Sequence, residues 1–293
     1  MSSVSPRTGT RADAVSQRPV TPAIGSLIEG LDLGALSDTD FAMLRGLVER
    51  RGVVFVRGQS LEPGQLVAFA RRFGPLQPSA ESAFSALPGH PEVDVLEADA
   101  EHPPLVTTEL WHTAFTSHVR PTMGTVLHGR IIPESGGDTI WVSLEAAWEH
   151  LSAPLRAYLQ GLRAEHRGAK AFADQIRMQL WTDAAGQERL RSLLLEPPAV
   201  HPVVRTHPVT GRKSLFVNEG YTTLIQGLHR KESDAVLGYL FDHLRTPEFQ
   251  VRHRWQAGDV AIWDNRCTMH YAVADYRGHR LMHRVTIEGD VPV

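Results

Sequence analysis

Apolar side chains recur along this chain with two different spacings, and each spacing predicts a different kind of element. Between residues 38 and 51 they recur every three or four positions, which predicts a helix whose N-cap is Ser37. Residues 53–56 form a short apolar run between two glycines, which predicts a buried strand, and residues 66–73 have the spacing of a second helix. The first part of the chain is therefore expected to brace a sheet with helices.

Farther along the chain, short runs with strand character recur between turn residues. Helical spacing interrupts them at residues 144–162 and 231–244. Short strands separated by turns are typical of an antiparallel barrel or sandwich. The expected strands cover residues 93–96, 124–127, 139–142, 203–206, 214–217, 251–255, 259–264 and 281–287.

The distribution of residue types predicts one folded domain. Residues 1–20 are rich in Ser, Thr and Arg and lack the apolar stretch of a secretion signal, so we expect a flexible N-terminal tail. Residues 21–293 are expected to form a single domain. Apolar residues mixed with charges at residues 168–198 predict a partly helical flap over the functional site.

Composition narrows the choice of partner. The formal net charge of −3 provides no positive field for nucleic acid or an anionic membrane, and no apolar run approaches the length of a membrane span. We therefore expect a small-molecule partner, and neither a nucleic-acid nor a membrane partner. Cys267 is the one cysteine, which excludes an intrachain disulfide and a zinc site of several thiolates, and fits a cytoplasmic protein.

The candidate chemistry lies in short blocks that follow one another in a defined order. The chain has 15 histidines, so two distant histidines would carry little weight without this context. The blocks are Trp111-His112-Thr113-Ala114, Gly136-Gly137-Asp138-Thr139, Asn218-Glu219-Gly220, Trp263-Asp264-Asn265-Arg266, and His270 with Arg280-Leu281-Met282-His283-Arg284.

In this order, the blocks resemble the taurine dioxygenase family of iron(II)- and 2-oxoglutarate-dependent oxygenases, with similarity from about Ile24 to the C-terminus. The resemblance implies a mainly β protein with helical inserts, folded as a double-stranded β-helix, or jelly-roll barrel. It implies that His112 and His270 bind iron(II), and that the enzyme uses 2-oxoglutarate and O2 on a small anionic organic substrate. Proteins that resemble this chain are commonly homo-oligomers.

The resemblance also implies roles for side chains around the metal. Thr139 matches a residue that hydrogen-bonds a carboxylate end of 2-oxoglutarate, and Arg280 matches the arginine that pairs with its distal carboxylate. Arg284 matches an arginine that contacts the anionic group of the substrate. Arg280 and Arg284 are four positions apart on an expected strand, so they point to the same face, where each guanidinium can form paired hydrogen bonds with an anion. Phe115 and Tyr221 are further candidates for substrate contact.

The departure from this pattern is Ala114. An iron that activates oxygen is usually held by two histidines and one carboxylate, and the residue two positions after His112 should be that carboxylate. An alanine cannot bind a metal, and the vacated position leaves room for chloride or another anion, as in the aliphatic halogenases that resemble this arrangement. We therefore favour radical halogenation of an aliphatic C–H bond.

Two other interpretations stay open. The chain could be a hydroxylase of a sulfonate, sulfate ester or carboxylate that carries an engineered Asp-to-Ala change at position 114. It could also be a non-catalytic protein that binds 2-oxoglutarate. Product identification with and without chloride, before and after Ala114→Asp, separates the three interpretations.

Overall fold

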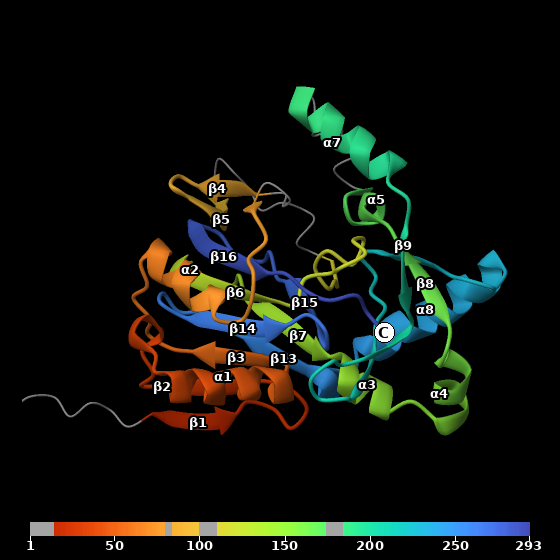
Figure 1. The fold of residues 1–293 in the computed structure, drawn as a ribbon, viewed down its shortest axis with the longest axis horizontal. Helices are drawn as coiled ribbons and strands as arrows, with labels where there is room; N and C mark the ends of the chain where they lie inside the picture. The colour runs from red at the N-terminus through yellow and green to blue at the C-terminus, as the bar shows by residue number, and fades with distance from the viewer. Residues whose placement is uncertain (1–14, 80–83, 100–109, 174–183) are drawn as a thin grey trace, which may run out of the picture.

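The computed structural model describes residues 15–79, 84–99, 110–173 and 184–293, and a large sheet forms its centre (Figure 1). Neighbouring strands of this eight-stranded sheet are antiparallel, except for one parallel pair between β2 and β3. In spatial order the strands are β1 (Ser16–Pro19), β2 (Ser26–Glu29), β3 (Val53–Val56), β14 (Val260–Asp264), β6 (Gly124–Ile131), β16 (Arg280–Ile287), β5 (His90–Ala98) and β4 (Ser85–Leu87).

A smaller antiparallel sheet packs against one face of the large sheet. Its strands are β13 (Gln250–His253), β7 (Thr139–Ser143) and β15 (Thr268–Ala272). The interface contains fully buried aromatic side chains, and the rings of Trp141 on β7 and Trp263 on β14 lie 5.4 Å apart. This sandwich places one end of β7, β15 and β16 around a common cavity.

Helices cover the opposite face of the large sheet, as the apolar spacing predicted. Helices α1 (Asp38–Arg51) and α2 (Pro63–Arg71) bury their apolar side chains against alternate residues of β3, β6, β14 and β16. The Ser37 side chain accepts a hydrogen bond from the backbone N–H of Asp40, which confirms the predicted N-cap. Successive residues of the central strands point alternately to the two faces of the large sheet. Both sets of side chains are buried, because helices cover one face and the smaller sheet covers the other.

The remaining elements form a third apolar cluster beside the sandwich. The predicted helix at residues 144–162 is two helices, because Ser152 and Pro154 begin a new one. These elements are α3 (Leu144–Glu149), α4 (Ala153–Leu159), α8 (Arg230–Leu244), the three-stranded sheet of β12 (Thr222–Ile225), β8 (Arg163–His166) and β9 (Ala199–Pro202), and the hairpin of β10 (Val204–Thr206) and β11 (Lys213–Leu215).

The structure refines the predicted architecture in several places. It is a mixed α/β arrangement with large antiparallel sheets, and in the described residues no strand pairing joins the two sheets of the sandwich into a closed barrel. Residues 16–19 form β1 and not part of a tail, because they pair with β2, whereas residues 1–14 of the predicted tail lie outside the described residues. No helix in the described residues is both long and apolar enough to cross a membrane.

The predicted flap at residues 168–198 is partly helical in its described residues. It contains α5 (Gly168–Ala171) and α7 (Ala184–Leu195), whereas residues 174–183 lie outside the described part. Figure 1 shows α7 extending away from the sheets. Ala171, Phe172 and Leu193 from this segment line the cavity, so the segment borders the candidate site.

Candidate functional site

A cavity of about 590 Å³ opens at the end of the sandwich and collects the residues that the sequence singled out. Its walls come from β5, β7, β15 and β16, from the turn after His112 and from the segment that contains α5 and α7. Every predicted site residue lines this cavity, namely His112, Ala114, Phe115, Thr139, Tyr221, His270, Arg280 and Arg284. The structure therefore brings the predicted residues together, and their individual roles stay predictions.

His112 and His270 form an isolated antiparallel β-bridge. The N–H of each residue donates to the carbonyl of the other, with N–O distances of 3.0 and 2.8 Å. The ring centroids lie 4.3 Å apart at an angle of 49°. Backbone pairing thus fixes two imidazoles side by side although they are 158 positions apart in the sequence.

The histidine pair is held in the neutral form that a metal requires. Burial lowers the pKa of His112, and burial together with the neighbouring His112 and Arg284 keeps the pKa of His270 well below its usual value. Nδ1 of His112 lies 2.7 Å from the carbonyl oxygen of Leu110, and since a carbonyl only accepts, Nδ1 carries the proton. Nε2 of His112 therefore keeps its lone pair for a metal ion.

A side-chain bridge adds to the backbone pairing of the two histidines. The Thr113 hydroxyl donates to the carbonyl of Thr268 at 2.8 Å, and both residues are buried. The Thr268 hydroxyl in turn donates to the carbonyl of Asp264 at 2.8 Å. This chain of hydrogen bonds connects the His112 segment to β15, the strand that carries His270.

Hydrogen bonds from other segments to backbone carbonyls fix the turn that follows His112, although Ala114 binds no metal. The Thr122 hydroxyl lies 3.4 Å from the Ala114 carbonyl, and Nε2 of His201 donates to the Thr116 carbonyl at 2.9 Å. Phe115 has a φ of 57°, which lies in the left-handed region that residues other than glycine rarely adopt. Such a conformation persists only where surrounding contacts enforce it, so the Ala114 methyl keeps a fixed place in the cavity wall.

No carboxylate replaces the missing ligand in the described part of the chain. The acidic side chains of the sequence blocks are engaged elsewhere, Asp138 with Arg252 and Glu219 with Arg245. Within the described ranges, no Asp, Glu or Cys completes a three-residue cluster of metal-binding groups with the histidine pair.

A second part of the cavity is built to receive a carboxylate. The Arg280 guanidinium is buried, its Nε has no hydrogen-bond partner among the described residues, and burial lowers its pKa. Trp255 donates to the Thr139 hydroxyl oxygen at 3.0 Å, which leaves the hydroxyl hydrogen for another acceptor. A Cβ at Gly137, whose φ is 70°, would lie 3.1 Å from the Tyr276 ring and 3.2 Å from Nε of Arg280. Glycine at this position therefore leaves the guanidinium unobstructed.

Arg284 lies in the cavity as predicted, but the sequence did not reveal its partner Asp94. Both Nε and Nη2 of Arg284 donate to the same oxygen of Asp94, at 2.9 and 2.7 Å. The guanidinium carbon lies 4.7 Å from the centre of the Phe84 ring. Asp94 and Arg284 are direct cross-strand neighbours on β5 and β16, and no local pattern relates two residues so far apart in sequence.

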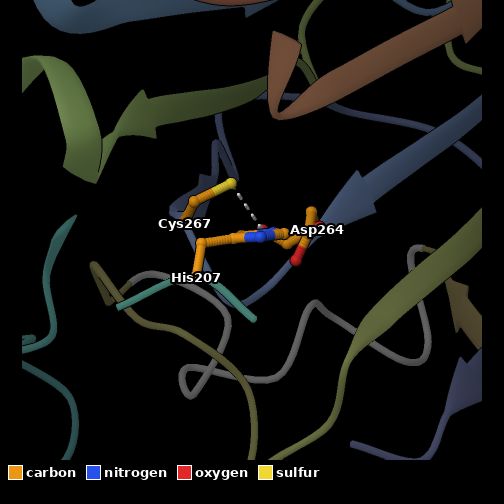
Figure 2. Close-up of side chains that lie close together, drawn as sticks. All are labelled: His207, Asp264 and Cys267. Carbon is orange, nitrogen blue, oxygen red and sulfur yellow. Dashed lines mark hydrogen bonds and ion pairs between the residues drawn. The ribbon is translucent and has the colours of Figure 1, made fainter. Parts of the chain in front are cut away.

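A buried cluster of His207, Asp264 and Cys267 has the composition of a metal site but not its chemistry (Figure 2). Two backbone N–H groups, of Val209 and Thr210, donate to Nδ1 of His207, so Nε2 carries the proton and donates to Asp264 at 3.0 Å. The Arg266 side chain also donates to both Asp264 oxygens, at 2.9 and 2.7 Å. A carboxylate with these donors is already neutralised, so the cluster is a structural support beneath β15.

The family of the chain follows from comparison with known proteins. Residues 16–286 match the family model described as taurine catabolism dioxygenase TauD, TfdA family. The chain belongs to this family. It is thus by family an Fe(II)- and 2-oxoglutarate-dependent dioxygenase, which confirms the family and the cofactors that the sequence blocks implied.

Individual relatives cover nearly the whole chain. It is 34% identical over 300 residues to an alpha-ketoglutarate-dependent sulfate ester dioxygenase of Pseudomonas putida, and the alignment covers 100% of this chain and 96% of the relative. It is 32% identical over 295 residues to an alpha-ketoglutarate-dependent 2,4-dichlorophenoxyacetate dioxygenase of Cupriavidus pinatubonensis (strain JMP 134), covering 96% of this chain and 100% of that one. The crystal structure of a taurine dioxygenase from Burkholderia xenovorans has a TM-score of 0.79 at 36% identity, covering 96% of this chain and 91% of that chain. These three proteins are named as dioxygenases, so the comparisons favour oxygenation over the halogenation that Ala114 suggested.

The residues present fit the family cofactors with one exception. The neutral histidine pair fits iron(II), and the buried Arg280 beside Thr139 fits a carboxylate of 2-oxoglutarate. Ala114 supplies no lone pair where the pattern expects a carboxylate. Among the described residues, a metal held here would find two protein ligands, His112 and His270.

Proposed function

We propose that this protein oxygenates an aliphatic C–H bond of a small anionic compound with an apolar body, using iron(II), 2-oxoglutarate and O2. The observation that carries the proposal is the joint placement of the neutral His112–His270 pair and the carboxylate-binding Arg280 and Thr139 in one cavity. The names of the sulfate ester, 2,4-dichlorophenoxyacetate and taurine dioxygenases support sulfate esters, aryloxyalkanoates and sulfonates as substrate classes.

Different side chains of the cavity would bind the metal, 2-oxoglutarate and the substrate. When bound, iron(II) with 2-oxoglutarate and O2 supplies the oxidant for C–H cleavage, while 2-oxoglutarate is converted to succinate and CO2. His112 and His270 would hold the metal, and Arg280 with Thr139 would orient 2-oxoglutarate through one carboxylate. Arg284 would bind the anionic group of the substrate, because a guanidinium matches planar and tetrahedral oxyanions.

The apolar lining determines where the rest of the substrate lies. Leu110, Phe115, Phe172 and Leu193 line the cavity together with the polar groups. Such a wall favours an alkyl or aryl body and excludes water from the reacting carbon. The cavity volume of about 590 Å³ leaves room for a body larger than that of a two-carbon sulfonate beside 2-oxoglutarate.

Halogenation is the second candidate function, and Ala114 is the observation that favours it. The Ala114 methyl lines the cavity in a turn that holds its shape without a carboxylate. A chloride ion at this position would supply the negative charge that an aspartate supplies in the usual ligand set. The same vacancy accepts water, which returns the outcome to oxygenation.

One experiment distinguishes these functions. The protein is loaded anaerobically with iron(II), 2-oxoglutarate and hexyl sulfate or 2,4-dichlorophenoxyacetate, and is then exposed to O2 with and without chloride. Succinate is measured enzymatically and products are identified by mass spectrometry, for the native protein and for Ala114→Asp.

Each outcome has one meaning. Succinate with an oxygenated or cleaved product from the native protein supports the proposal, and a chlorinated product that requires chloride supports the second candidate. Turnover by Ala114→Asp alone overturns both as descriptions of the native protein. Binding of 2-oxoglutarate without succinate in either form supports the non-catalytic interpretation.

The proposal includes the finer structural expectations. The two facing sheets support the double-stranded β-helix of the family, and the cavity lining by Phe172 and Leu193 supports a flap at residues 168–198. A homo-oligomer stays the expected state of assembly, to be measured by light scattering.

A further inference from the structure

The Arg284 side chain carries a positive charge that is already paired inside the protein. Asp94 is 3% exposed, and the Asp94 carboxylate accepts from two Arg284 nitrogens through one of its oxygens. The Arg284 side chain is 15% exposed and lines the cavity, whereas Asp94 is absent from the cavity lining. The carboxylate therefore lies behind the arginine, on the side away from the ligand space.

The pair is held by the sheet and by an aromatic ring. Asp94 and Arg284 stand directly opposite each other on β5 and β16, and neighbouring strands fix their separation. The Phe84 ring lies against the guanidinium, with the guanidinium carbon 4.7 Å from the ring centre. This packing leaves the guanidinium little freedom to turn away from Asp94 toward a ligand.

We propose that Asp94 tunes the charge preference of the cavity, because its carboxylate weakens the binding of a doubly charged head group more than that of a singly charged one. The inference rests on the proposed function, in which Arg284 binds the substrate anion. A phosphate dianion therefore loses more affinity to Asp94 than a sulfate monoester, sulfonate or carboxylate of the same shape does.

The physical reason is electrostatic. An anion bonded to the near side of Arg284 is attracted by the guanidinium and repelled by the Asp94 carboxylate behind it, so the pair attracts less strongly than a lone arginine. In a partly buried site, one unit charge acting across an intervening side chain changes affinity by on the order of tenfold for each unit of ligand charge. Repulsion by Asp94 therefore weakens a dianion by on the order of 100-fold and a monoanion by about tenfold.

The test compares hexyl sulfate and hexyl phosphate, which share a shape and differ in charge at pH 8. Both probes are measured by equilibrium dialysis with protein that contains iron(II) and 2-oxoglutarate under nitrogen. The variants are Asp94→Asn, which keeps the shape and removes the charge, and Arg284→Gln. Glu92→Gln is the matched control, because it removes a carboxylate two positions away on β5 that pairs with Arg71 on α2.

The expected result is a change of preference and not only of affinity. Relative to the native protein, Asp94→Asn should raise the affinity for hexyl phosphate by on the order of tenfold more than the affinity for hexyl sulfate. Arg284→Gln should weaken both probes, and Glu92→Gln should leave the preference unchanged. An unchanged preference in a folded Asp94→Asn protein overturns the inference.

A second variant keeps the inference testable in case Asp94→Asn does not fold. Asp94→Ser also removes the carboxylate charge, so it should shift the preference toward hexyl phosphate in the same direction as Asp94→Asn. An unchanged preference in a folded Asp94→Ser protein overturns the inference, whereas binding of neither probe to the native protein counts against the proposed function itself.

Discussion

Replacing Thr113 by valine tests whether the side-chain bridge between the two histidine segments serves the metal site. Valine has nearly the shape of threonine, so the substitution removes a hydroxyl and leaves no cavity. The lost interaction is the hydrogen bond from Thr113 Oγ1 to the Thr268 carbonyl at 2.8 Å. The backbone bridge between His112 and His270 stays intact, with its distances of 3.0 and 2.8 Å.

The expected magnitude follows from burial. Thr113 is 2% exposed and Thr268 is 0% exposed, so the abandoned carbonyl has no access to bulk water. Loss of a buried hydrogen bond with an unsatisfied partner lowers the free energy of unfolding by about 1–3 kcal/mol. Outer groups that orient metal ligands typically alter metal affinity by about 10- to 100-fold when they are removed.

The assay separates these two effects. Urea unfolding of the metal-free protein gives the free energy of unfolding, and titration with Mn(II) followed by electron paramagnetic resonance, in the presence of 2-oxoglutarate, gives metal affinity. Thr113→Ser keeps the hydroxyl and is the matched control, so it should restore most of both quantities. A Thr113→Val protein that loses stability but binds Mn(II) like the native protein would show that the bridge only supports the fold.

Three further predictions concern buried charges. Burial raises the pKa of Glu145 to about 7, so the stability contributed by its protonated form is present below pH 4.5 and is lost as the pH rises through about 7. Between pH 4.5 and pH 8, the free energy of unfolding of Glu145→Gln, measured with urea, should therefore rise by up to about 3 kcal/mol relative to that of the native protein. Parallel pH dependences of the two free energies would contradict this. Arg280→Lys should weaken 2-oxoglutarate binding by on the order of 100-fold in calorimetric titration, because a lysine cannot form the paired hydrogen bonds, and unchanged affinity would remove Arg280 from the site. Asp264→Asn should lower the free energy of unfolding by about 3–5 kcal/mol at pH 7, because it leaves the buried Arg266 without its counter-charge, and a loss below 1 kcal/mol by calorimetry would contradict the reading.

The sequence predicts those features of the fold that depend on neighbouring residues in the chain. Ser37 is an N-cap because its side chain reaches a backbone N–H three positions on, and the apolar spacing of α1 needs no distant partner. The division of residues 144–162 into α3 and α4 also has a local cause, Pro154, which the apolar spacing alone concealed. β15 went unpredicted because its register comes from pairing with β7, and its own sequence carries no clear alternation.

The candidate site was readable to the extent that ordered blocks identify a family. His112, Thr139, His270 and Arg280 were assigned from their order, and the structure places all of them on one cavity. The outcome of the reaction was not readable from Ala114, because a vacated ligand position admits a halide or water equally well. The relatives favour oxygenation, which the sequence reading had ranked second.

By itself, the sequence determined the two histidines, the order of the blocks that contain them, and the absence of a ligand at position 114. These are properties of residue type and short spacing, and they do not depend on how distant segments meet. Only the tertiary structure decided that Asp94 stands behind Arg284, because a cross-strand contact between residues 190 positions apart depends on the register of β5 with β16. The net charge at the substrate end of the cavity is therefore a product of strand pairing, and it is the property on which the charge selectivity proposed for this protein depends.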